Sequence, residues 1–216
     1  MEQLVMKDIS EQIRGVSYRP EDVVTGPSLD SIGILRANNI DDGKVNFNDL
    51  IYVKKEKVCE KQMLREGDIL ICASSGSKKL VGKAAQIKSS CKYSFGAFCK
   101  VIRPKKVSSE FLGIYFQSDM YRSYISRMAQ GANINNIKNE HIDEIKIRKF
   151  DGLQQREIAE KLGKIIDIID MRKQQLYELD NLIKSRFIEM FGDPVNNVSK
   201  WEKKTIESVC NDIYGG

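Results

Sequence analysis

Three polar segments carry the side chains best suited to contacting a charged or hydrogen-bonding ligand. The first follows an apolar run and contains Ser74, Ser75, Ser77, Lys78 and Lys79, with Lys83 shortly after. Its hydroxyls, flexible backbone amides and cations form a set that suits phosphate oxygens. A solvated charged turn has the same composition, so both interpretations stay open.

The second and third segments are rich in amides. The second contains Gln130, Asn133, Asn135, Asn136 and Lys138, and the third contains Arg36, Asn38 and Asn39. Asn and Gln can pair in bidentate fashion with adenine in the major groove of DNA, and Arg suits guanine. Asn also favours turns and helix caps. The amides therefore predict either base contacts or local structure.

Motifs that would indicate catalysis are weak. The stretch from Gly76 to Ala84 resembles a phosphate-cradling loop, but five residues separate its two glycines instead of four, and Ala84 replaces the required hydroxyl. His141 is the single histidine, so neither a histidine pair for a metal nor a Ser-His-Asp set can be assembled. We predict a chain with no catalytic residues and no bound metal or cofactor.

A Glu-x-Lys spacing, found in some metal-dependent nucleases, occurs at Glu144 and Lys146. In an alternating strand these two charges form the solvent face, whereas Ile145 and Ile147 form the buried face. We expect a solvated edge here. A nuclease that depends on this pair is the third alternative, and the pair is its only support.

Composition allows, but does not require, a polyanionic partner, because 35 Lys and Arg outnumber 30 Asp and Glu for a net charge of +5. The five cysteines lack the two-residue spacing of zinc or redox pairs and are predicted to be buried free thiols; they are Cys59, Cys72, Cys91, Cys99 and Cys210.

No apolar run is long enough to span a bilayer, and the acidic start does not resemble a signal peptide. We expect a soluble cytoplasmic protein without a membrane partner.

Hydrophobic patterning predicts an α+β domain over residues 1–150. Short apolar or alternating runs predict strands at 32–40, 68–73, 84–87, 97–102 and 144–147. Helical spacing over 111–128 predicts one helix packed on them.

Residues 151–191 predict one long helix, free of proline, of the coiled-coil type. Apolar residues recur in alternating steps of four and three, and we assign dimerisation to Ile158, Leu162, Ile165, Ile169, Leu176, Leu179 and Ile183. Arg172 and Arg186 occupy other positions of the same seam. A helix of roughly 50 Å outside a small domain needs a partner helix. Ile166, Ile168 and Phe187 widen the apolar face beyond the seam, which allows one side to pack on the domain and the other on a second helix. The alternative is a surface helix lying flat on its own domain.

Residues 192–216 echo the start of the chain. Met6, Ile9, Ile13 and Gly15 match Ile206, Val209, Ile213 and Gly215 in spacing, at an offset of 200 residues. We interpret this segment as the opening of a second copy of the domain that is cut short.

In order and spacing, several segments resemble the specificity subunits of Type I restriction-modification systems. They are Leu64–Ile71, Ser74–Gly76, Gly131–Ile147, Leu153–Ala159, the long helix, and Phe187–Pro194. The resemblance implies a non-catalytic DNA-binding subunit in which each α+β recognition domain reads one half of a split site in double-stranded DNA and long helices pack antiparallel as a spacer.

The same resemblance implies partners. They are modification (M) subunits that bind S-adenosylmethionine and methylate adenine, and restriction (R) subunits that use ATP and magnesium to translocate and cleave. This chain has one recognition domain and one long helix, so we expect a homodimer that rebuilds the two-domain architecture. Two alternatives remain: a truncated product that does not assemble, and a coiled-coil adaptor that never touches DNA.

Overall fold

The computed structural model describes residues 2–130, 136–193, 196, 201–202 and 204–209. The chain divides into two compact units, Met1–Gly163 and Lys164–Gly216. An α+β domain followed by a long helix is the predicted fold class, and it is confirmed. Within the described residues, no helix is both long enough and apolar enough to cross a bilayer.

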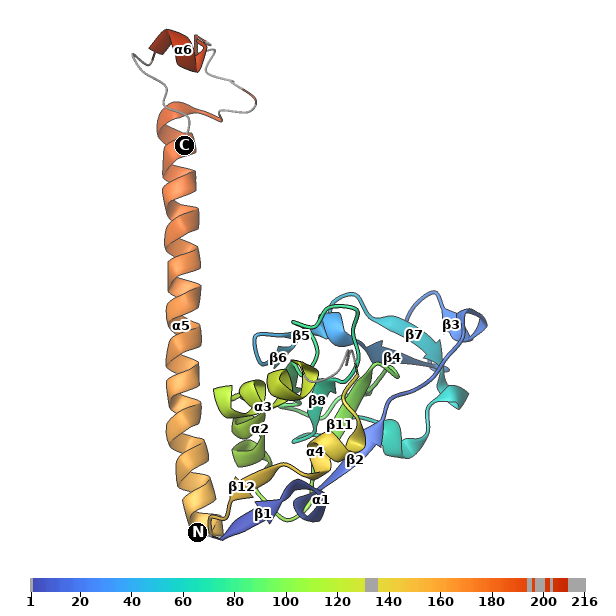
Figure 1. Ribbon diagram of the computed structural model, residues 1–216. Coiled ribbons are helices and arrows are strands. Elements are labelled where there is room, and N and C mark those ends of the chain that lie inside the picture. Colours follow the sequence, from blue (N-terminus) through green and yellow to red (C-terminus); the bar gives the residue numbers. More distant parts are fainter. Residues whose placement is uncertain (1, 131–135, 194–195, 197–200, 203, 210–216) are drawn as a thin grey trace. The chain divides into compact units, whose positions relative to one another are not determined.

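The first unit is built from short strands (Figure 1). One antiparallel sheet has the order β2–β11–β8–β9, formed by Ser10–Arg14, Cys99–Pro104, Ile69–Cys72 and Ala84–Gln86. A second sheet has the order β10–β4–β7–β3, formed by Tyr93–Phe95, Ser31–Leu35, Ile51–Lys54 and Val23–Val24, with β10 and β4 parallel. Two antiparallel pairs join β1 (Gln3–Val5) to β12 (Lys146–Arg148) and β5 (Ile40–Asp41) to β6 (Lys44–Val45).

The helices are α1 (Met6–Ile9), α2 (Ser109–Gln117), α3 (Asp119–Gln130), α4 (Asn139–Asp143), α5 (Gly152–Phe191) and α6 (Ile206–Val209). The single helix predicted over 111–128 is wrong, because the chain breaks at Ser118. There the backbone is extended, with ψ at 156°, and the hydroxyl donates to the Tyr115 carbonyl at 2.7 Å. A serine that satisfies the last carbonyl of a helix in this way competes with continuation of the helix.

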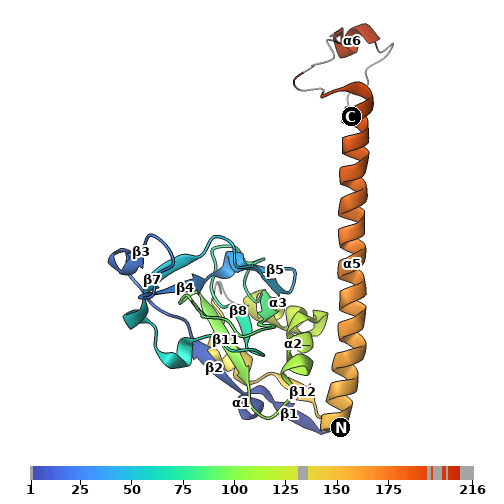
Figure 2. The same ribbon diagram turned by 180° about the vertical axis from the view of Figure 1, so that it is seen from behind.

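Strand β8 is buried on both faces because layers cover it from both sides (Figures 1 and 2). Ile69 and Ile71 belong to the core that includes α2 and α3, whereas Leu70 and Cys72 belong to the core that includes β4 and β10. A strand between two apolar layers reads as a continuous hydrophobic run, as Ile-Leu-Ile-Cys does here. The loop at its C-terminal end is therefore carried by a strand that is packed on both faces.

The β2 strand passes very close to the turn between β10 and β11. A Cβ atom added at Gly15 would lie 2.1 Å from the Gly96 carbonyl oxygen. The neighbouring Val16 N–H donates to the Phe95 carbonyl at 2.7 Å, which fixes this approach. Glycine at position 15 is therefore required by space.

We expect Gly15→Ala to lower the free energy of unfolding by about 3 kcal/mol, since backbone must move to admit the methyl group. Gly26→Ala is the matched control, because no atom of the described residues lies within 4 Å of a Cβ at that position. Urea unfolding of both variants measures the difference. Equal stability of the two would show that the strands separate without cost.

The first and last strands of the domain are neighbours. Leu4 of β1 pairs with Ile147 of β12, and the Lys149 N–H donates to the Glu2 carbonyl at 3.1 Å. Figures 1 and 2 both show β1 and β12 side by side. Only a few residues then separate β12 from α5.

Helix α5 has clear start and stop signals. The Asp151 carboxylate accepts hydrogen bonds from the N–H groups of Leu153 at 2.9 Å and Gln154 at 2.8 Å, and the Gln154 side chain accepts from the Asp151 N–H. This is a capping box. At the other end Gly192 has φ of 78°, and its N–H donates to the Ile188 carbonyl, as a C-terminal glycine does.

The beginning of α5 packs on its own domain. Gln155 accepts from the Ser108 N–H at 2.8 Å and donates to the Phe150 carbonyl at 2.9 Å, and Ala159 is buried. Ile158 packs against the same core. Its assignment to the dimerisation seam stays a prediction, although its own domain already covers part of this side chain.

From Leu162 onward the seam residues are exposed. The six that remain have exposed fractions from 40% at Leu162 to 67% at Ile183; they are Leu162, Ile165, Ile169, Leu176, Leu179 and Ile183. At 40 residues and about 1.5 Å per residue, α5 is about 60 Å long. So long a row of exposed apolar side chains is unusual for a protein surface.

The echo at an offset of 200 residues has a counterpart in local structure. Met6–Ile9 forms the short helix α1, and Ile206–Val209 forms the equally short helix α6. The rest of the echo, at Ile213 and Gly215, lies outside the described residues. The proposed second copy of the domain therefore stays a prediction.

Candidate functional site

A concave pocket of about 850 Å³ forms where two of the predicted polar segments meet. Arg36 and Asn38 contribute from the loop between β4 and β5, and Ser74 and Ser75 contribute from the loop after β8. Phe98, on the turn before β11, lies on the wall and is 71% exposed. Among the described residues lining the pocket, Arg36 is the charged one and none is acidic.

A second pocket, of about 390 Å³, adjoins the first, and Ala97 lines both. Asn136 and Lys138, from the remaining predicted segment, line this pocket. Their segment is joined to the first loop by a bridge between Ser74 and Asn136 and by the Ile137 N–H, which donates to the Ala73 carbonyl at 2.7 Å. The three predicted segments thus converge, although about a hundred residues separate the outer two.

The second pocket is strongly cationic. Arg14, Lys100 and Lys138 line it, and no acidic side chain does so among the residues described there. Lys100 donates to Asn139 Oδ1 at 2.5 Å, and burial lowers its pKa, partly offset by Asp143 and Glu140. A half-buried ammonium gains from an added anion, since its solvation by water is incomplete.

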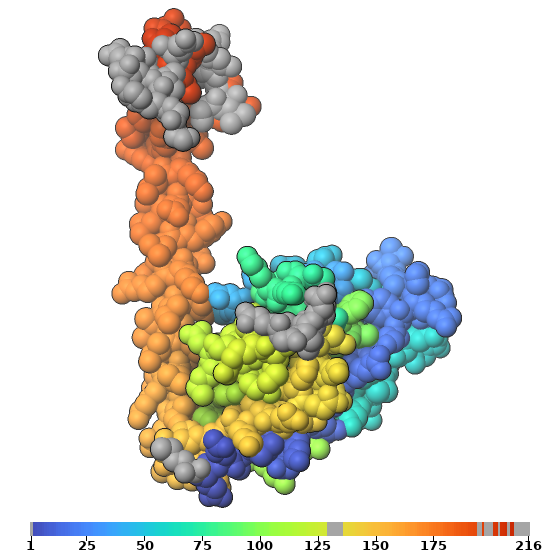
Figure 3. All heavy atoms as spheres, viewed as in Figure 1, coloured from blue at the N-terminus to red at the C-terminus, as the bar shows by residue number. Residues whose placement is uncertain are grey.

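The loop after β8 protrudes from the surface of the first unit, where Figure 3 shows it in blue-green. Arg122 of α3 supports it by donating to the carbonyls of Val81 at 3.1 Å and Lys79 at 3.3 Å. Ser77, Lys78 and Lys79 are exposed. Lys83 differs from them, because its Nζ lies 3.8 Å from an Asp41 carboxylate oxygen and its side chain is 34% exposed.

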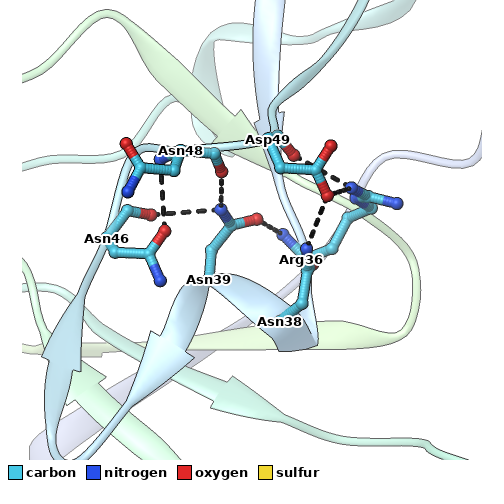
Figure 4. Close-up of polar contacts among 6 residues, drawn as sticks. All are labelled: Arg36, Asn38, Asn39, Asn46, Asn48 and Asp49. Atoms are coloured by element: carbon cyan, nitrogen blue, oxygen red, sulfur yellow. Dashed lines mark hydrogen bonds and ion pairs between the residues drawn. The ribbon is translucent and has the colours of Figure 1, made fainter. Parts of the chain in front are cut away.

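Arg36 and Asn38 are held by a residue that we did not predict (Figure 4). Arg36 Nη2 donates to the Asp49 carbonyl at 2.9 Å and to its carboxylate at 2.8 Å. Asn38 Nδ2 donates to the same carboxylate oxygen at 3.0 Å. Asp49 thus gathers both predicted base-contacting side chains.

Asn39 has a structural place instead of the predicted base-contacting one. It is completely buried, its Oδ1 accepts from the Arg36 N–H, and its Nδ2 donates to the carbonyls of Asn46 and Asn48. The first bond closes the 36–39 loop on itself, and the other two tie it to the 46–49 loop. Both N–H donors of the amide are engaged and the side chain is out of reach of a base, so Asn39 is removed from the candidate set.

Three predicted residues cannot be placed. Asn133 and Asn135 lie outside the described residues. Gln130 ends α3, and its side chain is likewise outside the described part.

The cysteine prediction is partly wrong. Cys72 and Cys99 are buried and face each other across β8 and β11, and burial raises the pKa of both thiols, that of Cys99 to about 12. Cys59, in contrast, is exposed, and Cys91 is half-buried. Cys210 lies outside the described residues. In the described part of the chain, no three His, Cys, Asp or Glu side chains are grouped so that they could hold a metal ion.

The expected solvated edge at Glu144 and Lys146 is confirmed. Both side chains are exposed, whereas Ile145 and Ile147 are buried.

Several residues of the two pockets escaped the sequence prediction. They are Gln12, Arg14, Phe98, Lys100 and Asn139. Asp49, which holds Arg36 beside the larger pocket, escaped it too. The polar run from Asn46 to Asp49 before a strand was a usable signal, because such runs mark loops at strand ends. No sequence signal marked Arg14 or Lys100, since each is a single cation within a strand.

Polar loops gathered at one end of a sheet define a recognition surface on a rigid scaffold, the usual arrangement of binding proteins. Residues 27–181 match the family described as Type I restriction modification DNA specificity domain. The chain belongs to this family.

Two relatives have similar sequences. The EcoKI specificity subunit of Escherichia coli strain K12, a Type I restriction enzyme subunit, is 36% identical over 96% of this chain and 48% of the relative. The StySPI specificity subunit of Salmonella potsdam is 40% identical over 82% of this chain and 38% of the relative. The chain therefore spans at most about half the length of the curated relatives it matches.

Solved structures share the fold. The HsdS subunit of Thermoanaerobacter tengcongensis aligns with a TM-score of 0.60 at 16% identity, over 88% of this chain and 44% of that one. A chain from the structure described as the basis of complex assembly and conformational transition of the type I R-M system aligns with a TM-score of 0.64 at 16% identity, over 85% and 43%.

Proposed function

We propose that this chain is a DNA-sequence-reading subunit of a Type I restriction-modification complex and carries no catalytic step of its own. The observation that supports this most directly is the convergence of Arg36 and Asn38, Ser74 and Ser75, and Asn136 and Lys138 around two adjoining pockets. Direct readout needs hydrogen-bonding side chains grouped on one surface with cations beside them for the phosphates.

The two pockets divide these tasks by their chemistry. The cationic pocket at Arg14, Lys100 and Lys138 suits a backbone phosphate. The larger pocket, with Arg36 as its charged residue and Asn38 beside it, suits the edges of bases. Lys78 and Lys79 extend the phosphate-binding side along the protruding loop.

The assembly that we propose is a two-fold homodimer through α5. The exposed apolar row from Leu162 to Ile183 supports it, because a second copy would supply a complementary row. Two identical domains related by a two-fold axis would read inverted half-sites. Modification and restriction subunits, carrying S-adenosylmethionine, ATP and magnesium, would complete the complex in the cytoplasm.

The test is the salt dependence of binding to mixed-sequence duplex DNA, measured by fluorescence anisotropy between about 50 and 200 mM salt. We expect the double variant Lys78→Ala/Lys79→Ala to bind more weakly. Its plot of log K against log salt should be shallower by about 2, since each lost phosphate contact removes about 0.9 from the slope.

Lys54→Ala/Lys55→Ala is the matched control, because it removes two exposed adjacent lysines that line neither pocket. Its slope should equal that of the wild type. A wild-type chain that shows no salt-dependent binding would contradict the proposed function and favour an adaptor that contacts only protein.

A further inference from the structure

The loops at 36–39 and 46–49 form one rigid unit with the side chains of Arg36 and Asn38 on it. The buried amide of Asn39 joins the two loops, and the Asp49 carboxylate joins the two outer side chains (Figure 4). The Arg36 side chain is 34% exposed and that of Asp49 is 77% exposed. The unit is thus preorganised yet accessible from the pocket.

Two features of this unit cost stability. Asp49 has φ of 52°, in the left-handed region that residues other than glycine seldom adopt. Arg36 Nε is buried and has no hydrogen-bond partner in the described part of the chain, an arrangement that costs about 1–3 kcal/mol. Local costs that the fold does not need are typical of functional sites.

The chemistry of the pair points to a neutral acceptor. A guanidinium carries five N–H donors in a planar fork, and Asp49 engages only Nη2 among the contacts described here. A phosphate approaching Arg36 would meet the negative charge of Asp49. Guanine O6 and N7 are neutral acceptors, and Arg binds them in bidentate fashion in the major groove.

Resting on the proposed function, we propose that Arg36 reads the guanine of one G·C base pair and that Asp49 is the positioning residue that holds Arg36 in the reading orientation. A carboxylate that fixes the guanidinium in advance reduces the side-chain entropy lost on binding. It also makes the orientation suited to one base edge more populated than the alternatives.

The experiment is selection of bound sequences from randomised duplex DNA by the full-length chain, followed by affinity measurements on the selected duplex and on its single-base-pair variants. We expect the wild type to enrich a G·C pair at one position. Arg36→Ala and Asp49→Asn should both relax the preference at this same position, by about 5- to 150-fold for Arg36→Ala and by a smaller factor for Asp49→Asn.

Asp49→Asn should leave binding to mixed-sequence DNA equal to or tighter than that of the wild type, since it removes a negative charge. A merely structural role would weaken binding to all sequences alike. Asp42→Asn is the matched control, because Asp42 is also exposed and also left-handed, with φ of 44°. Asparagine tolerates this conformation as aspartate does, and thermal unfolding verifies that each variant is folded.

The outcomes separate the two proposals. If the wild type enriches a sequence but Arg36→Ala and Asp49→Asn leave every position unchanged, or relax different positions, the inference about Arg36 and Asp49 is overturned while the proposed function stands. If the wild type binds no duplex and enriches nothing, both are overturned.

Discussion

Arg103→Met is expected to lower the free energy of unfolding by about 3–5 kcal/mol. Arg103 on β11 donates Nε and Nη2 to the two carboxylate oxygens of Asp68 at 2.8 and 2.7 Å, and Nη2 also donates to the Met63 carbonyl. The Asp68 side chain is 1% exposed. Removing the guanidinium would leave a buried carboxylate without its counter-charge, which is why the cost is large.

Lys149→Met is the matched control for this variant. Lys149 and Glu2 make an ion pair at 2.8 Å, but their side chains are 48% and 73% exposed. Exposed pairs contribute about 0–1 kcal/mol. Urea unfolding of both variants measures the contrast. If both variants lost a similar free energy of unfolding, burial of the Arg103–Asp68 pair would not increase its contribution to stability.

The double variant Ile169→Glu/Leu176→Glu is expected to convert the proposed dimer into a monomer. Pairing through α5 would bury four introduced carboxylates per dimer, and each buried unpaired charge costs several kcal/mol, so dissociation should increase by more than about a thousandfold. Glutamate favours helix as strongly as leucine does, so α5 should persist in circular dichroism. Light scattering should give about twice 24.7 kDa for the wild type and the single-chain mass for the variant.

Gln174→Glu/Asn181→Glu introduces the same charge on the same helix, outside the heptad seam. This control should stay dimeric. A wild-type chain that is monomeric would contradict the homodimer proposal. The exposed apolar side chains on α5 would then require a helix from another protein chain.

The sequence was most informative where periodicity is strong. Helix α5 was predicted within a residue of its bounds, since the apolar steps of four and three and the absence of proline mark one long element. Strands β8, β9, β11 and β12 were predicted within two residues. Strands such as Ser10–Arg14 were missed, because a short polar run is extended only through its pairing with β11.

The sequence identified the polar loops of the site but not which of their side chains lie together. Ser74 and Arg36 were identified from residue type, yet nothing local to either indicates that they share one pocket. Asn39 and Asn38 look alike in sequence, and only the fold decides that one ties two loops together while the other is exposed. In the same way the Leu64–Ile71 stretch contains Asp68, but its partner Arg103 lies 35 residues away.

The pairing of β1 with β12 has a genetic consequence. Because the chain leaves and returns to the same two-stranded ladder before α5 begins, the DNA that encodes the residues between could be replaced by a homologous stretch without altering the path into the helix. Recombination inside the two short coding segments for this ladder would then transfer the whole pocket-bearing domain as a cassette. Two crossovers, one in each segment, would exchange both pockets together and leave the coding sequence of α5 unchanged.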